Sequence, residues 1–292
     1  MSAGSTGVVL VVVTYRRDPS DLSACLDSLD AAGGFEHLVV VDNAATAVVG
    51  PAPGRTLIRP GVNDGFGAGA NAGFAEARRR GATTIVLLND DLLVSAGWLD
   101  PLVAELAAPT VGAVQPLLVL AAGLQVNSVG VEIGADGAGH DIGFGLPVAD
   151  IAPTPRDIDV FSAGAVAFRT EFLVATHGFD ERFFLYYEDV DLARRGAELG
   201  WSYRCAPASI VVHRKGASTS QLGDELAYLQ ERNRLWSALR HEPPGTIGRT
   251  FWLSIRRLRH RPRLAHLRGL AAGSSGAPVR LFERYRARRH RN

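Results

Sequence analysis

The sequence has few cysteines and no long apolar run, and each shortage excludes a class of protein. Cys25 and Cys205 are the two cysteines, and their separation fits neither a disulfide-rich secreted domain nor a metal-ligand motif. The longest apolar runs, 8–13 and 117–124, are far shorter than the roughly 20 residues of a membrane-spanning helix. We therefore expect reduced core thiols and a cytoplasmic protein in which 8–13 is a buried strand and not a signal peptide.

Basic residues are scarce in the body of the chain and gather near its C-terminus. Of 31 basic and 30 acidic residues, 13 arginines and one acid, Glu283, lie from Arg249 onward. Apolar anchors stand among these arginines at 251–253 and 281–282, so the segment could contact an anionic membrane at its inner face. A solvated, partly disordered tail is the equal alternative. A nucleic-acid partner is not expected, because a basic tail alone does not indicate a nucleic-acid-binding domain.

Apolar strands alternate with helical patterns along most of the chain. At 292 residues and 47% hydrophobic content, the chain can bury a full core. The alternation predicts an α/β fold with a parallel sheet covered by helices on both faces. Strands or strand-like segments are expected at 8–14, 38–42, 56–59, 84–88, 111–120 with a break at Pro116, 160–169, around 203 and at 210–213. Helical patterns are expected at 22–29, 74–80, 97–108, 170–177, 189–199 and 224–240.

Two segments depart from this alternation. Residues 123–155 are rich in Gly, Pro and Asp, which predicts loops and hairpins that could shape an acceptor site. Pro243-Pro244-Gly245 marks an expected boundary. We therefore expect a catalytic domain at 1–242 and a basic, helical or partly disordered tail at 243–292.

Polar residues follow four of the expected strands. Ligands of open α/β sheets bind beyond the carboxyl ends of the strands, so these positions are the first candidates for a site. Each could be an ordinary turn or helix cap, but their coincidence favours function. They are Thr14-Tyr15-Arg16, Asp42-Asn43, Asn63-Asp64-Gly65 and Asn89-Asp90-Asp91.

The adjacent acids Asp90 and Asp91 suggest a divalent cation. Two carboxylates at the end of a buried strand repel each other unless a cation or strong donors compensate. Mg²⁺ or Mn²⁺ suits oxygen ligands and also takes diphosphate oxygens. His213 could complete the metal shell if the sheet brings it beside Asp91, and Lys215 could meet a diphosphate. The alternatives are a capping carboxylate and a structural histidine.

Two further segments are candidates for binding and catalysis. The glycine-rich stretch 65–73 could bring backbone amides close to a phosphate or ribose, or it could provide a close contact between helix and sheet. Glu188, Asp189 and Asp191 follow an aromatic stretch at an expected helix start. Acids cap helix starts, but a general base also requires a fixed, partly desolvated carboxylate, and we favour that function here.

Taken in order, these motifs resemble the family 2 glycosyltransferases with a GT-A fold, particularly the rhamnosyltransferase-like branch. The resemblance covers roughly residues 8–240. It rests on Val-Val-Val-Thr-Tyr-Arg at 11–16, Val-Asp-Asn at 41–43, Asn63 with Gly65-Phe66-Gly67 and Asn71, Leu-Asn-Asp-Asp at 88–91, Gly178-Phe179-Asp180-Glu181, Glu188-Asp189-Val190-Asp191-Leu192 and Glu231-Arg232-Asn233-Arg234.

The resemblance implies an inverting, metal-dependent hexosyltransferase with a Rossmann-like, mostly parallel central sheet. It implies transfer of a sugar from a nucleotide diphosphate donor to the hydroxyl of a glycan, lipid-linked or small-molecule acceptor, as in cell-surface glycan synthesis. L-rhamnose from dTDP-rhamnose is the favoured donor. UDP-hexoses, UDP-galactofuranose and GDP-mannose are alternatives.

The resemblance also implies residue roles. Asp189 would be the catalytic base, with Glu188 and Asp191 orienting base and acceptor. Asp91 matches the last acid of the Asp-x-Asp metal motif, and His213 resembles the histidine that joins the metal in some relatives. The chain departs from the motif at its first position, which is Asn89. The implied donor-binding residues are Thr14, Tyr15, Arg16, Asp42, Asn43, Asn63, Gly65, Gly67, Asn71, Asn89, Asp90 and Lys215.

Two other functions share parts of this pattern. A nucleotidyltransferase acting on sugar phosphates would use the same architecture and an acidic metal site. It would also require a second metal or a phosphate-activating basic loop, and no Gly-rich loop follows the first strand. A non-catalytic sugar-binding protein should have lost the acidic pair at 188–189, which this chain keeps.

Overall fold

The computed structural model describes residues 7–15, 19–44, 52–121, 123–214, 223–259 and 262–289, with the backbone alone at 287–289. Arg16 and Lys215, both expected to bind the donor, lie outside these ranges. The strands are β1 Val8–Thr14, β2 His37–Asp42, β3 Arg55–Ile58, β4 Thr84–Asn89, β5 Leu92–Leu93, β6 Val111–Leu120, β7 Val126–Ser128, β8 Val131–Ile133, β9 Gly139–Asp141, β10 Arg156–Ile158, β11 Ala165–Arg169 and β12 Ser202–His213. The helices are α1 Pro19–Ala32, α2 Phe66–Arg79, α3 Leu99–Leu106, α4 Thr170–Thr176, α5 Glu188–Glu198, α6 Gly223–His241, α7 Pro244–Arg257, α8 Arg263–Ser275 and α9 Ala277–Arg289, with 3₁₀ turns η1 Val148–Asp150 and η2 Glu181–Phe183.

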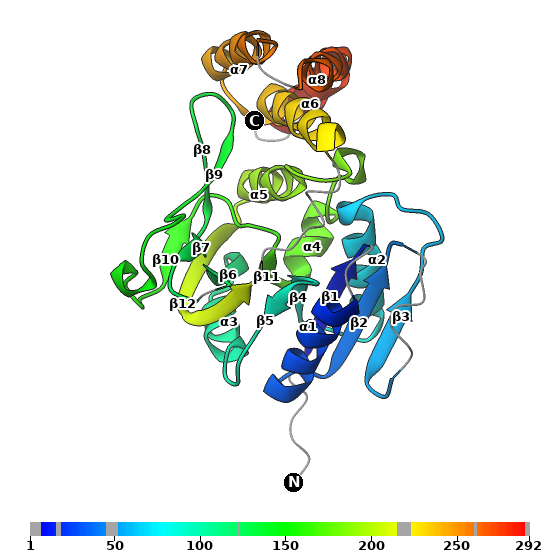
Figure 1. The fold of residues 1–292 in the computed structure, drawn as a ribbon, viewed down its shortest axis with the longest axis vertical. Coiled ribbons are helices and arrows are strands. Elements are labelled where there is room, and N and C mark those ends of the chain that lie inside the picture. Colours follow the sequence, from blue (N-terminus) through cyan, green and yellow to red (C-terminus); the bar gives the residue numbers. More distant parts are fainter. Residues whose placement is uncertain are drawn as a thin grey trace.

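A ten-stranded mixed sheet forms the centre of the molecule (Figure 1). Its order is β10-β12-β6-β11-β4-β1-β2-β3, with β5 beside β12 and β7 beside β6. The strands β3, β2, β1, β4, β6 and β12 run in one direction, whereas β11 runs antiparallel to β4 and β6. The expected α/β class with a mostly parallel central sheet is therefore confirmed.

Helices cover both faces of this sheet because alternate residues of each strand point to opposite sides. In β1, Val9 and Val11 pack into a core shared with α2, α4 and α5. Leu10 and Val12 pack into a second core shared with α1 and α3. The near-continuous apolar run of β1 is thus that of a strand buried on both faces.

The predicted breaks in two strands were wrong. β6 runs through Pro116 without a break, and β12 is one strand where two short ones were expected. The register between the two strands shifts between Ala206 and Ile210, and Ala206 pairs with Pro116. Proline has no N–H to donate, so the β6–β12 pair already lacks one possible backbone hydrogen bond at Pro116. The irregularity therefore disrupts few further hydrogen bonds.

The C-terminal helices α7, α8 and α9 pack around α6 at one end of the molecule, at the top of Figure 1. Gly269 of α8 makes a close approach possible, because a Cβ added there would lie 2.7 Å from Cβ of Glu231. Arg280 of α9 is 2% exposed, lies 3.2 Å from Asp180 and stacks over the ring of Trp236 at 4.4 Å. The expected tail thus contains helices packed on the rest of the chain, while its division from the catalytic domain stays a prediction.

Candidate active site

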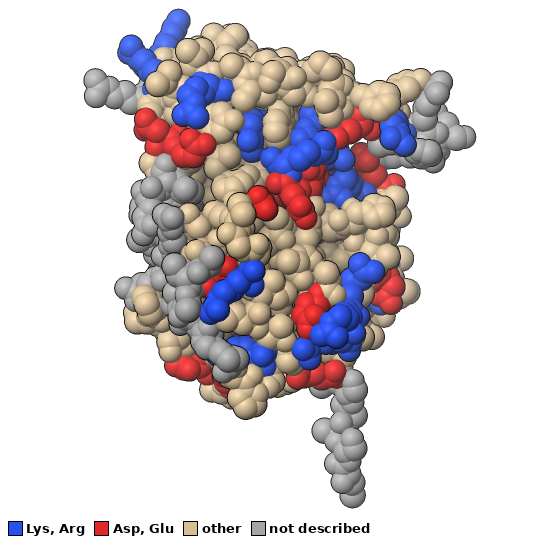
Figure 2. Space-filling view, turned by 90° about the vertical axis from the view of Figure 1, so that its right-hand side faces the viewer, with Lys and Arg blue, Asp and Glu red and all other residues tan. Residues whose placement is uncertain are grey.

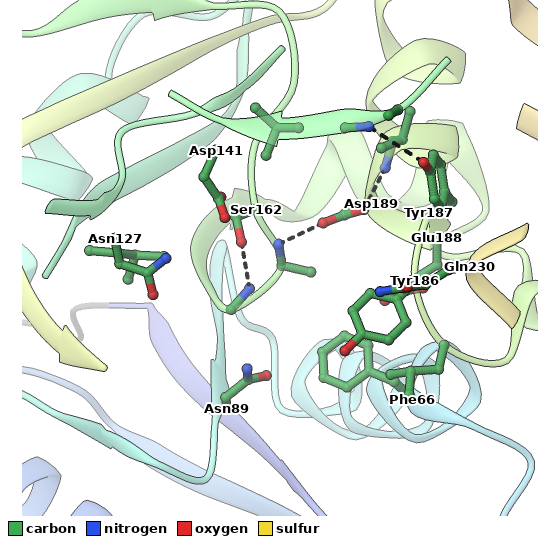
Figure 3. Close-up of a pocket in the computed structure, with 18 of the residues that line it drawn as sticks. Phe66, Asn89, Asn127, Asp141, Ser162, Tyr186, Tyr187, Glu188, Asp189 and Gln230 are labelled. Carbon is green, nitrogen blue, oxygen red and sulfur yellow. Dashed lines mark hydrogen bonds between the residues drawn. The ribbon is translucent and has the colours of Figure 1, made fainter. Parts of the chain in front are cut away.

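A cavity of about 850 Å³ opens beside the carboxyl ends of β4 and β12. The β8–β9 hairpin, the start of α5 and the helices α6 and α7 complete its wall, and Figure 3 shows how side chains from these elements converge. Its polar and charged lining residues are Asn89, Asp91, Asn127, Asp141, Ser162, Glu188, Asp189, His213, Gln230, Arg234 and Arg257. The cavity therefore joins strand-end residues to residues more than 100 positions away.

Asp91 and His213 meet at one end of this cavity. His213 Nε2 lies 3.2 Å from Asp91 Oδ1, and β5 and β12 pair so that the two residues are brought together. The other ring nitrogen, Nδ1, lies 2.6 Å from Oδ1 of Asn127. Because an amide oxygen only accepts hydrogen bonds, Nδ1–H donates to Asn127 and fixes the orientation of the ring, so that Nε2 faces the carboxylate of Asp91.

This donor set fits a divalent cation. An imidazole nitrogen and a carboxylate oxygen that face the same cavity are two of the ligand types that a divalent cation takes in proteins. Among the described residues, no third His, Cys, Asp or Glu joins the pair. Asp91 and His213 would therefore hold a Mg²⁺ or Mn²⁺ ion whose remaining ligands come from water or a bound diphosphate.

Glu188 and Asp189 reach the cavity from the first turn of α5. The N–H groups of Ala163 and Val190 donate to Asp189 at 3.2 and 2.8 Å, which fixes the carboxylate (Figure 3). Burial, together with the nearby Asp141, raises the pKa of Asp189 to about 6. Burial and the neighbouring Asp189 raise the pKa of Glu188 to about 8. Both acids are therefore harder to ionise than exposed carboxyls, so this pair holds a proton more readily than two exposed acids would.

Asp191, although expected beside the base, lies elsewhere. It is fully buried and does not line the cavity. Its carboxylate accepts hydrogen bonds from Arg195 and Arg240, both at 2.7 Å, and lies 2.9 Å from His241 Nε2. Asp191 therefore joins α5 to α6 and lies outside the cavity, and its predicted role of orienting base and acceptor stays a prediction.

A strained turn directs the acidic pair into the cavity. Phe184, Tyr186 and Tyr187 all have positive φ angles, near 67–70°, which residues other than glycine rarely adopt. The amide of Asn233, fully buried in α6, donates to three carbonyl oxygens within 183–186 at 2.8–2.9 Å. The motif at 231–234 thus holds the backbone that places Glu188 and Asp189.

The expected donor residues at the first two strand ends form a buried polar cluster. Thr14 donates to Asp90 at 2.7 Å, and the N–H of Asn43 donates to the carbonyl of Thr14 at 2.9 Å. Asp42 is 2% exposed and accepts from a neighbouring backbone N–H. Tyr15 follows β1 and is partly exposed. None of these residues lines the main cavity, so their part in donor binding stays a prediction.

The glycine-rich segment and its asparagines pack against 178–184. A Cβ at Gly65 would lie 2.3 Å from the carbonyl oxygen of Phe184, and one at Gly67 would lie 3.2 Å from Cβ of Phe179. Asn63 accepts from the N–H of Gly65 at 3.1 Å. These contacts are structural, and the predicted contacts of Gly65, Gly67 and Asn63 with the donor remain untested.

Asn71 and Asn43 line a second, smaller cavity of about 310 Å³. Both amide atoms of Asn71 bind the backbone of Phe179, at 2.9 and 3.0 Å, and Nδ2 also donates to Glu181 at 2.8 Å. Asn43 donates to the carbonyl of Gly65 at 3.0 Å. The predicted donor residues are therefore divided, with Asn89 in the main cavity and Asn43 and Asn71 outside it.

Several cavity residues had no signal in the sequence. Asn127 and Asp141 come from the loop-rich segment 123–155, whose expected role as an acceptor wall gave no individual positions. Gln230 and Arg257 come from α6 and α7, where helical periodicity does not show which side chain faces a cavity. Only the pairing of distant elements reveals these residues.

Sequence comparisons find related proteins over most of the chain. Residues 9–122 match the model of "Glycosyl transferase family 2". The chain is 30% identical over 228 residues to the O-antigen biosynthesis protein RfbC of Myxococcus xanthus, covering 73% of this chain and 18% of that protein. It is 27% identical over 238 residues to an N-acetylglucosaminyl-diphospho-decaprenol L-rhamnosyltransferase of Mycobacterium tuberculosis, covering 73% of this chain and 77% of that protein.

Solved structures share the fold at low sequence identity. GalNAc-T7, solved with UDP, GalNAc and Mn²⁺, aligns with a TM-score of 0.69 at 13% identity, over 92% of this chain and 54% of that one. The mannosyltransferase PcManGT of Pyrobaculum calidifontis, solved with GDP-Man and Mn²⁺, aligns with a TM-score of 0.52 at 20% identity, over 96% and 73% of the chains. The chain is therefore similar to the family 2 glycosyltransferases over residues 9–122, has rhamnosyltransferase-like relatives at 27–30% identity and shares the GT-A fold of the solved structures.

Proposed function

We propose that this chain is an inverting glycosyltransferase that moves a sugar from a nucleotide diphosphate to an acceptor hydroxyl. One observation carries the proposal: a fixed, partly buried carboxylate, Asp189, shares a cavity with the Asp91–His213 pair. Such a cavity has a basic group for the acceptor at one place and a cation site for the leaving diphosphate at another. The family match supports the same reaction class.

Asp189 acts as the base in this proposal. Its carboxylate accepts the proton of the acceptor hydroxyl while that oxygen forms a bond to the anomeric carbon. The bond from this carbon to the diphosphate oxygen breaks in the same step, and the nucleotide diphosphate leaves with the electron pair. The attacking oxygen and the leaving oxygen lie on opposite faces of the sugar, so the configuration inverts.

Glu188 supports this chemistry as a neutral acid. One of its carboxyl oxygens is buried without a hydrogen-bond partner among the described residues. Burial and the neighbouring Asp189 raise its pKa, which favours its protonated form and so lessens the negative charge beside Asp189.

The Asp91–His213 pair is the proposed metal site. A bound Mn²⁺ or Mg²⁺ would offset the negative charge that grows on the departing diphosphate. Asn127 serves this site by holding the His213 ring through Nδ1, and Asn89 lines the same cavity. Arg16 and Lys215 keep their predicted roles beside the donor.

The relatives guide the choice of substrates. The mycobacterial relative is named as an L-rhamnosyltransferase acting on a diphospho-decaprenol, and RfbC is named for O-antigen biosynthesis. We therefore take dTDP-L-rhamnose as the donor and a lipid-linked glycan as the acceptor, with cell-surface glycan synthesis as the process. Glycan and small-molecule acceptors without a lipid are the alternatives.

A ligand panel tests this function. Thermal unfolding of the chain is measured with dTDP-, UDP- and GDP-sugars, each with Mn²⁺, Mg²⁺ or a chelator. Ligand binding to the native state raises its stability, by about 2.7 kcal/mol at a hundredfold excess over Kd. Stabilisation by a dTDP-sugar that the chelator abolishes is expected. Stabilisation by another sugar nucleotide would correct the donor, and none by any of them would contradict the proposal.

A further inference from the structure

The three C-terminal helices carry their apolar side chains on the outside. Trp252 is 54% exposed in α7, Leu264 is 67% exposed in α8 and Phe282 is 58% exposed in α9. The residues these helices bury are small or polar: Thr250 and Ser254 in α7, Ala265, Gly269 and Gly273 in α8, and Arg280 in α9. A helix that only covers a soluble core shows the opposite pattern, with its apolar stripe inward.

The three helices pack together at one end of the molecule. α8 contacts both α7 and α9, and all three pack on α6. We define the arginine–apolar surface as the exposed arginines of residues 249–286 together with Trp252, Ile255, Leu264, Leu267, Leu281 and Phe282. In Figure 2 this end of the molecule lies at the top, where a largely tan area has blue side chains at its margins. An exposed apolar region of this kind marks an interaction site.

The positive charge of this surface favours an anionic partner. Every exposed charged side chain among the described residues from 243 onward is an arginine, and the one acid, Glu283, is partly buried against Arg182 and Arg280. Arg268 is the exception to a purely cationic surface, because it lies 3.6 Å from Glu225 of α6. A second copy of this chain would bring arginine against arginine, which disfavours a symmetric dimer. An anionic lipid surface complements both the arginines and the apolar side chains.

We propose that the arginine–apolar surface binds peripherally to an anionic lipid bilayer. Trp252 suits the interface between headgroups and acyl chains, and Arg256 stacks on its ring at 4.7 Å with its charge left for a phosphate. A helix long and apolar enough to cross a bilayer is absent from the described residues. The contact is therefore one of helices lying on the membrane.

This contact would bring the cavity to the membrane. Arg257, from the same helix as Trp252 and Ile255, lines the cavity, as do Gln230 and Arg234 of the underlying α6. If the proposed glycosyl transfer is correct, the cavity's α6–α7 end faces acceptors that are anchored in the bilayer. The surface thus assigns the acceptor to the lipid-linked class.

Vesicle sedimentation of the full chain, without nucleotide sugar, tests the surface. Wild-type protein is expected to bind vesicles that contain phosphatidylglycerol, to bind phosphatidylcholine vesicles weakly, and to be released by high salt. Three double variants replace the apolar pair of one helix each: W252E/I255E, L264E/L267E and L281E/F282E. A loss of at least about tenfold in partitioning is expected for the helices that touch the lipid.

A matched control replaces two equally exposed apolar residues outside these helices, Phe144 and Leu146, which are 54% and 49% exposed. F144E/L146E should bind as the wild type does, and all variants should keep the wild-type unfolding midpoint because the sites are exposed. Equal binding by all variants, or no binding by the wild type, overturns the proposal. A dimer in sedimentation velocity that only the helix variants dissociate would assign the surface to a second copy instead.

The outcome is separable from that of the proposed function. Donor stabilisation in the ligand panel does not depend on lipid, so a wild-type chain that shows donor stabilisation but binds no vesicles rejects the surface alone. Vesicle binding without any donor response rejects the transferase proposal and leaves the surface standing.

Discussion

The first turn of α5 has two sides, and its acids differ completely between them. On the cavity side, Asp189 accepts hydrogen bonds from backbone amides, no ion pair joins Glu188 or Asp189 to a described cation, and burial raises the pKa of both acids. On the α6 side, burial alone would raise the pKa of Asp191, but Arg195, His241 and Arg240 hold it far below its usual range. Neighbouring acids thus lie in opposite electrostatic environments, one side without a cation and the other side surrounded by cations.

The difference shows how a fold creates reactive and inert carboxylates. A buried acid without a cation is costly to ionise, so it remains ready to accept or hold a proton. A buried acid surrounded by cations is held in its charged form, and removing it is strongly destabilising because its partners are left uncompensated. Substitutions on the two sides of α5 should therefore have separate effects, on turnover for the cavity side and on stability for the α6 side.

Replacing Asp189 by asparagine should have the largest effect on turnover. The amide cannot accept the acceptor proton, so kcat should fall by about 10²–10⁴-fold. Stabilisation by the donor should be unchanged, because the Asp91–His213 pair is untouched. Steady-state transfer assays and the thermal unfolding panel measure the two quantities. Near-normal turnover would mean that another carboxylate is the base.

Replacing Asp191 by asparagine should instead affect stability. The variant leaves Arg195, Arg240 and His241 without their shared counter-charge, which should cost about 3–5 kcal/mol of unfolding free energy. Urea unfolding measures this loss, and Glu225→Gln, which breaks the exposed pair with Arg268, should cost less than about 1 kcal/mol. The folded fraction of Asp191→Asn should retain its turnover. A variant with wild-type stability but low turnover would mean that Asp191 takes part in catalysis.

The sequence predicts the sheet better than it predicts the site. Strand-end positions such as Asp91 could be placed from the apolar pattern alone, because ligands of α/β sheets bind where the strands end. The separation of Asp191 from Glu188 and Asp189 could not, since all three share the same turn and the difference depends on α6. Arg240 and His241 lie about 50 residues downstream, and no local pattern links them to α5.

The C-terminal segment shows the same limit. Its arginine-rich composition predicted a tail or a membrane contact, but composition could not reveal that Arg280 is buried or that the apolar side chains face outward. Small residues such as Gly269 decide this orientation, because they let α8 approach α6 closely. Helical periodicity therefore indicated which residues share a face, and only the packing indicated which face is covered.

The pH dependence of stability distinguishes the two sides of α5 most finely. The raised pKa values of Asp189, about 6, and Glu188, about 8, mean that the folded chain holds more protons than the unfolded one above the ordinary carboxyl pKa of about 4. Their contribution to stability therefore falls as pH rises towards 8 and is constant above it. Asp191 behaves oppositely, because its lowered pKa makes its contribution present above the ordinary value and lost as pH falls below it.

Glu188→Gln isolates the cavity side of this balance. The variant should lose the decline in stability between about pH 6 and 8, roughly 1–2 kcal/mol, because no proton is released there on unfolding. Its kcat/KM should still rise through pH 6 as Asp189 ionises. Urea unfolding at several pH values and pH–rate profiles measure both. If the unfolding free energies of wild type and variant fall equally between about pH 6 and 8, Glu188 is already ionised at neutral pH. Asp189 then works beside a second negative charge.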